Sequence, residues 1–168
     1  MTYLNPFALG LLLAVIATPA PAQQFSAGGI VIEGPWARAT PKGASVAAGY
    51  MTIRNSGGVA DKLTGGSTDF AGGIEVHEMA MQGAVATMRA LPDGLTIPPN
   101  GSIVLKPRGY HLMFRGLKQP FTKGETVKAT LTFEHAGDIP IELKVESVGA
   151  MAPGDRTSPD QMKGMKMD

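Results

Sequence analysis

The sequence TVKATLTFEH, residues 126–135, alternates apolar and polar residues, with apolar side chains at Val127, Ala129, Leu131 and Phe133. Successive side chains of a β-strand point to opposite faces, so the alternation predicts a strand with one buried and one exposed face. Residues 141–148 repeat the pattern, and Ala136-Gly137-Asp138 lies between the two stretches. Because Gly and Asp are typical turn residues, we expect two consecutive strands here.

The rest of the chain follows the same plan. Further short apolar or alternating segments lie at residues 30–33, 47–54, 74–81, 86–90, 102–106 and 110–115, separated by breaks rich in Gly, Pro, Asn and Asp. No segment shows a convincing helical period. Many short strands with regular turns predict an all-β domain, either a β-sandwich or a Greek-key barrel.

Composition excludes several classes of function. The 168 residues contain no cysteine, which excludes disulfides, thiolate nucleophiles and iron–sulfur sites. Blue-copper electron-transfer sites also need a cysteine and are excluded. The net charge is +1 and aromatic residues make up 6%, so no nucleic-acid partner is expected.

Both ends of the chain differ from its middle. Residues 1–22 lack charged side chains and end in Ala-Pro-Ala, which predicts a signal peptide cleaved near Ala22 and export to the periplasm. The apolar run of this signal peptide is too short to span a membrane, so no stable membrane span is expected after cleavage. Residues 23–148 form the predicted β-sandwich domain. Residues 149–168 contain Gly, Pro and Met without alternation and predict a flexible Met-containing tail.

Two groups of histidine and methionine stand out because the chain has only three histidines. Residues two apart in a strand share a face, so His111 and Met113 project together. His77 shares a face with Met79 in another predicted strand, and Met88 follows after a turn. A hairpin there would return Met88 toward His77, so one end of the sandwich would collect His77, Met88, His111 and Met113.

The types of these residues point to one metal. Imidazole and thioether ligands together favour Cu(I) over hard cations such as Mg²⁺ or Ca²⁺. All of the candidate ligands are neutral, which suits a monovalent ion, and a site near the surface would let a partner replace them one at a time. The residue types leave a plainer alternative open. Single histidines on strands are usually surface or core residues, and single methionines usually fill the core.

The spacing of these residues resembles the PCu(A)C family of periplasmic copper chaperones. In the family pattern a His is followed after ten residues by a Met, and after a little over twenty more by His-x-Met. Here ten residues separate His77 from Met88, and twenty-two separate Met88 from His111-Leu112-Met113. The resemblance covers roughly residues 30–148. It implies a cupredoxin-like Greek-key β-sandwich that binds Cu(I) through His77, Met88, His111 and Met113.

The resemblance also implies a role and partners. These are delivery of copper toward cytochrome c oxidase assembly, a copper-accepting oxidase subunit, and a Sco-type thioredoxin-like protein. Two alternatives stay open: a periplasmic copper-scavenging or resistance protein with the same site, and a metal-free β-sandwich interaction module. An enzyme is not expected, because no nucleophile with a base stands out.

Other residues receive structural interpretations. Trp36 is expected in the core, Arg38 as a solvated charge, and His135 in an exposed turn. Met79 and Met81 are interpreted as packing residues at the end of the sandwich, and a role as alternate ligands or as a shield against water stays open.

Overall fold

The computed structural model describes residues 23–83 and 85–155, and within those ranges it contains strands and their connections without a helix. No described segment could therefore cross a membrane as a helix. The predicted signal peptide, residues 1–22, and residues 156–168 of the predicted tail lie outside the described ranges. The predicted all-β class is confirmed by the strands β1 Gln24–Ala27, β2 Ile30–Arg38, β3 Val46–Asn55, β4 Asp61–Ser67, β5 Gly73–Gln82, β6 Val85–Ala90, β7 Leu95–Ile97, β8 Gly101–Leu105, β9 Tyr110–Arg115, β10 Thr126–Phe133 and β11 Gly137–Glu146.

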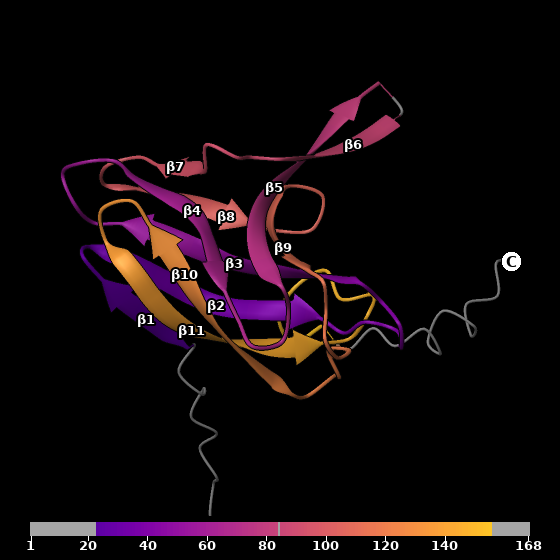
Figure 1. Cartoon of the computed structure of the whole chain (residues 1–168). Coiled ribbons are helices and arrows are strands. Elements are labelled where there is room, and N and C mark those ends of the chain that lie inside the picture. Colours follow the sequence, from indigo (N-terminus) through magenta and orange to yellow (C-terminus); the bar gives the residue numbers. More distant parts are fainter. Residues whose placement is uncertain (1–22, 84, 156–168) are drawn as a thin grey trace, which may run out of the picture.

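The long strands close on themselves. Neighbours follow the order β2, β11, β10, β4, β5, β9, β3, and the pairing of β3 with β2 completes the ring. The β2–β11 pair is parallel, and the other pairs of the ring are antiparallel. Figure 1 shows β1, β2 and β11 in one curved layer, with β4, β5 and β9 in the other. The molecule is therefore a β-sandwich whose two layers are joined at their margins.

The core lies inside this ring. In β10 the inward residues are those that the alternation predicts, Val127 through Phe133 at every second position, and all of them are buried. Phe114 of β9 contacts Phe121 edge-on, with ring centroids 5.2 Å apart. Burying one large apolar side chain contributes roughly 1.5–3 kcal/mol. The inward faces of the strands therefore supply the main driving force for this fold.

Strands β1, β4 and β7 were not predicted from the sequence, and β4 shows why. Its Gly65 has a φ of 150°, a conformation that residues with side chains rarely adopt. A Cβ on Gly66 would lie 2.3 Å from the carbonyl oxygen of Thr130 in β10. This close approach requires glycine, and consecutive glycines interrupt the apolar alternation on which strand prediction depends.

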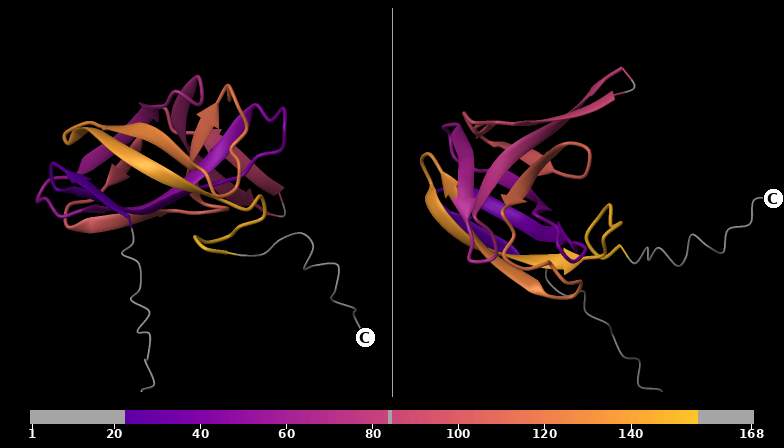
Figure 2. Two further views of the ribbon diagram at one scale, coloured as in Figure 1. Left: turned by 90° about the horizontal axis from the view of Figure 1, so that it is seen from below. Right: turned by 45° about the vertical axis from the view of Figure 1, so that its right-hand side comes forward.

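The β5–β6 hairpin projects beyond the rest of the molecule (Figure 1; Figure 2, right). Among the described strands, β6 pairs with β5 alone. The side chains of Val85 and Met88 on β6 are exposed. The hairpin thus carries its residues away from the core and toward solvent.

The chain stays attached to the domain after β11. Ala150 is completely buried in a small cluster with Trp36 and Tyr50. The Nε of Arg38 donates a hydrogen bond of 2.7 Å to the Ala150 carbonyl oxygen. The predicted start of a tail directly after Val148 is therefore too early, because a backbone contact and a buried side chain hold the next residues to the domain.

Candidate metal centre

The pairing of β5 with β9 places two histidines side by side. His77 lies opposite His111 and Glu75 lies opposite Met113 in this antiparallel pair. Residues directly opposite each other share a face of the sheet, so these side chains form one group. The centroids of the two imidazole rings are 5.8 Å apart. The structure thus brings together His77, His111 and Met113 from the predicted ligand set.

The opposite face of the same strands explains their orientation. Val76 of β5 and Leu112 and Phe114 of β9 alternate with the group and are buried in the core. A slip of one residue would turn the imidazoles into the apolar core, so packing of the inner face fixes the register that assembles the group.

Met88 occupies a different position. On β6 it lies opposite Met79, whereas the residue opposite His77 is Ala90. Met88 therefore shares the face of His77, two residues further along the hairpin and one strand away from β9. Its side chain is 53% exposed, while His111 and Met113 are 4% and 8% exposed. Met88 thus stands at the open side of the group, away from the buried side chains of His111 and Met113.

His77 has one ring nitrogen bound and one free. Its Nε2 lies 2.9 Å from Oε2 of Glu75, and the second carboxylate oxygen, Oε1, accepts a hydrogen bond of 2.8 Å from Arg115. These contacts lower the pKa of Glu75, against a smaller opposing effect of burial. The Nδ1 of His77 is buried and has no hydrogen-bond partner in the part of the chain that the structure describes. A buried imidazole nitrogen with a free lone pair is an available ligand.

His111 is held from the other side of its ring. Its Nδ1 lies 3.0 Å from the carbonyl oxygen of Gly109, which accepts only, so Nδ1 carries the proton. Burial lowers the pKa of His111, the nearby His77 lowers it further, and the Gly109 hydrogen bond opposes both. The imidazole is therefore held neutral, with its Nε2 lone pair available to an ion.

The third histidine is not part of this group. His135 lies exposed after β10, as predicted, and its backbone N–H donates to Asp61. Within residues 23–83 and 85–155, no group of three or more His, Cys, Asp or Glu side chains could hold a metal ion.

Sequence reasoning missed the groups that orient the histidines. Glu75 and Arg115 each stand two residues from a candidate ligand on the same face, as strand spacing alone would show. The Gly109 carbonyl had no sequence signal, because any residue offers one. The side chain of Met81 lies outside what the structure describes, and Met79 is partly buried.

Arg38 corrects another expectation. It is not a simple solvated charge, because its guanidinium lies 5.6 Å from the centroid of the Tyr50 ring and donates to the Met151 sulfur at 3.0 Å. Trp36 is buried as expected, with its ring centroid 4.5 Å from that of Tyr50. Trp36 and Tyr50 belong to the small cluster around Ala150 rather than to the main core.

Known proteins resemble this chain along most of its length. A family model described as "Putative lipoprotein LpqE-like" matches residues 30–145. The "Putative lipoprotein Lxx21020" of Leifsonia xyli subsp. xyli is 29% identical over 140 residues, covering 82% of this chain and 83% of the relative.

Two solved structures share the fold. The copper-bound PCuAC domain from PmoF2 is 28% identical, with a TM-score of 0.64, covering 74% of this chain and 98% of that domain. The solution structure of CuI-DR1885 from Deinococcus radiodurans is 31% identical, with a TM-score of 0.57, covering 74% and 81% of the two chains. These likenesses confirm the cupredoxin-like β-sandwich expected from the sequence.

Proposed function

Because the chain belongs to the LpqE-like family and shares its fold with PCuAC domains, one of them solved with copper bound, we propose that it is a copper chaperone. It binds one Cu(I) through His77, Met88, His111 and Met113. The observation that carries this proposal is the facing imidazole pair beside Met113, in which the buried Nδ1 of His77 has no hydrogen-bond partner among residues 23–83 and 85–155.

The chemistry of these donors supports a soft monovalent ion. A buried acceptor without a hydrogen bond is unfavourable, and binding an ion there would relieve that cost. The ligands are two neutral imidazoles and two thioethers, a set that prefers Cu(I) to hard cations. Four protein ligands fill a tetrahedral ion and leave no open position for a substrate. We therefore propose a carrier and not an enzyme.

The unequal exposure of the ligands supports delivery. His111 and Met113 are buried, whereas Met88 is half exposed on the projecting hairpin. A partner can then displace Met88 first, while the other three ligands still hold the ion. The partners we propose are a copper-accepting oxidase subunit in cytochrome c oxidase assembly, and a Sco-type thioredoxin-like protein.

The proposed location is the periplasm. The family resemblance and the leader pattern at residues 1–22 both support export. None of the 168 residues is a cysteine, so none offers a thiol for the lipid attachment that a lipoprotein name suggests.

The central test is titration of the purified protein with Cu(I) under reducing conditions, followed by X-ray absorption. The expected result is one Cu(I) per chain with both nitrogen and sulfur neighbours. A stoichiometry of zero, or a copper ion with only nitrogen and oxygen neighbours, contradicts the proposal.

Delivery and sequestration are separated by a second measurement. Loaded protein is mixed with an apo oxidase fragment, and copper is followed on both chains. Transfer faster than loss to a competing chelator supports a chaperone. Retention of the ion on this chain favours the scavenging role instead.

A further inference from the structure

We propose that Glu75 is a positioning residue that holds His77 with its proton on Nε2, so that Nδ1 is the nitrogen presented to the metal. The inference rests on the proposed function and deepens it, since it assigns a specific donor atom and the group that selects it. His111 presents the other nitrogen, Nε2, so the two facing imidazoles bind the ion through different ring positions.

The first step is the contact between Glu75 and His77. A carboxylate accepts hydrogen bonds and does not donate them, so the 2.9 Å contact from Oε2 to Nε2 requires the proton on Nε2. In a neutral imidazole the other nitrogen then carries the lone pair. That nitrogen, Nδ1, is buried without a partner among the described residues. The hydrogen bond therefore leaves His77 with one defined donor atom for an ion.

The second step is what holds the carboxylate itself. Oε1 of Glu75 accepts a hydrogen bond of 2.8 Å from Arg115, while Oε2 contacts His77. Each oxygen thus has its own partner, and rotation of the carboxylate would break both contacts. Arg115 lies on β9, the strand of His111 and Met113, so the Arg115–Glu75–His77 chain ties the β5 ligand to the β9 ligands.

The third step is the contrast with His111. A backbone carbonyl, that of Gly109, fixes its proton on Nδ1. Ligating histidines in metalloproteins commonly donate their other N–H to a carboxylate or a carbonyl, which fixes both the tautomer and the ring orientation. Here His77 has a carboxylate partner and His111 has a carbonyl partner. Only the carboxylate partner can be removed by substitution, so Glu75 is the position at which the arrangement can be tested.

The experiment reads the tautomer directly. Nitrogen-15 NMR of the metal-free protein at pH 8 is recorded for the unchanged protein and for Glu75→Leu, with the fold checked by circular dichroism. The side chain of Glu75 is 41% exposed, so the fold is expected to survive. The unchanged protein should show His77 protonated on Nε2, and Glu75→Leu should shift His77 toward the other tautomer while His111 stays unchanged.

Copper binding supplies the second readout. Cu(I) affinity, measured against a competing chelator, should fall by about 10- to 100-fold in Glu75→Leu. Glu75→Gln keeps an acceptor and should recover part of that loss. Arg115→Gln loosens the carboxylate without altering β5 and should cause a smaller loss. Glu78→Gln is the matched control, because the Glu78 carboxylate pairs with Arg89 of β6.

The outcomes separate the two proposals. Copper binding of normal affinity by Glu75→Leu, or an unchanged protein with His77 protonated on Nδ1, overturns the role of Glu75 and leaves the copper site standing. No Cu(I) binding by the unchanged protein overturns the proposed function, and with it the assignment of Nδ1 as a ligand. A copper-loaded protein whose nitrogen shifts place the metal on Nε2 of His77 overturns the positioning proposal alone.

Discussion

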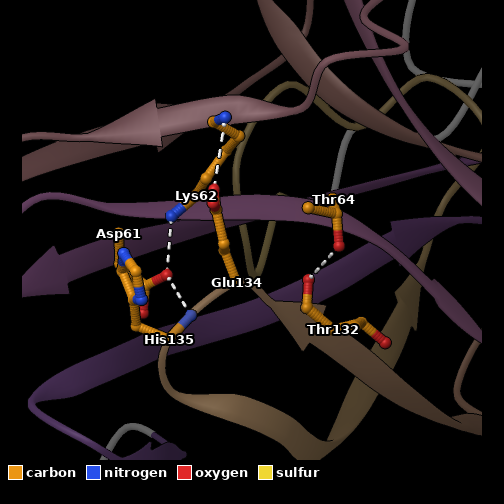
Figure 3. Close-up of polar contacts among 6 residues, drawn as sticks. All are labelled: Asp61, Lys62, Thr64, Thr132, Glu134 and His135. Atoms are coloured by element: carbon orange, nitrogen blue, oxygen red, sulfur yellow. Dashed lines mark hydrogen bonds and ion pairs between the residues drawn. The ribbon is translucent and has the colours of Figure 1, made fainter.

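Two buried polar groups in this protein have opposite hydrogen-bond states. Asp61 begins β4, and its Oδ1 accepts hydrogen bonds of 2.7 Å from the Lys62 N–H and 2.9 Å from the His135 N–H (Figure 3). Its Oδ2 accepts a third, of 2.9 Å, from the Ala136 N–H. The buried Nδ1 of His77, by contrast, accepts no hydrogen bond from any described residue. Both oxygens of the carboxylate accept hydrogen bonds from the backbone, whereas the imidazole nitrogen is available to a ligand.

The comparison separates structural from functional polar residues. Burial raises the pKa of Asp61, but the hydrogen bonds from His135, Lys62 and Ala136 together outweigh it and lower that pKa. Their effect is to fasten the turn after β10 to the start of β4. A buried polar group is retained either because the backbone needs it or because a ligand does, and its hydrogen bonds show which.

Replacing His77 by Ala tests the functional side and should have the largest effect. A ligand is lost, so Cu(I) affinity should fall at least about 100-fold, the upper end of what loss of a ligand's supporting partner costs. Stability should change little, because the ring already holds an unsatisfied nitrogen. Chelator competition and thermal unfolding of the metal-free protein measure the two quantities. Normal affinity in this variant would remove His77 from the site.

Asp61→Asn tests the structural side with the opposite pattern. An amide places an N–H donor against the backbone N–H of a neighbour, so about 1–3 kcal/mol of stability should be lost in urea unfolding. Cu(I) affinity should stay within about twofold, because no candidate ligand contacts Asp61. Asp138→Asn is the control, since that exposed side chain should matter by less than about 0.5 kcal/mol. Equal stability of the Asp61 and Asp138 variants would contradict this interpretation.

Lowering the pH should remove the contribution of Asp61 to the stability of the folded protein. The pKa of Asp61 is lower in the folded protein than its ordinary value of about 3.9. Its contribution is therefore fully present above that value and is lost as the pH falls through the folded pKa. Urea unfolding of the metal-free protein between pH 6 and pH 3 should show this loss, and Asp61→Asn should flatten it. An unaltered acid profile in the variant would assign the loss to other carboxylates.

Met88→Leu should have a moderate effect confined to copper. The side chain is half exposed, so a change to an apolar residue of similar volume should leave thermal stability unchanged. Loss of one exposed thioether should weaken Cu(I) binding by about tenfold, equivalent to about 1.4 kcal/mol. The same chelator competition measures it. Val85→Leu on the same hairpin is the control and should bind normally.

His135→Ala should have the smallest effect. Its side chain is exposed, and its contact with Asp61 uses the backbone N–H, which alanine retains. Stability should change by less than about 0.5 kcal/mol, with unchanged Cu(I) affinity. Weaker binding would show that the third histidine contributes to the site.

The sequence predicted those parts of the molecule that depend on regular spacing. Alternation located β10 and β9, and the His-x-Met spacing placed His111 and Met113 on one face. It could not predict β4, where close packing against β10 selects consecutive glycines. Strand spacing places Glu75 on the face of His77, but it does not show that Arg115 of β9 holds the Glu75 carboxylate in contact with Nε2. The packing of β4 on β10 and the contact from Arg115 both depend on long-range strand pairing, which no local pattern records.

The burial of Ala150 beside Trp36 has a practical consequence for spectroscopy. Trp36 is the chain's sole tryptophan, so intrinsic fluorescence reports on whether residues 149–155 are docked against Tyr50. A shortened recombinant protein ending at Val148 would uncover both aromatic rings and change the emission before any metal is added. Fragments intended for optical titrations should therefore extend through Asp155.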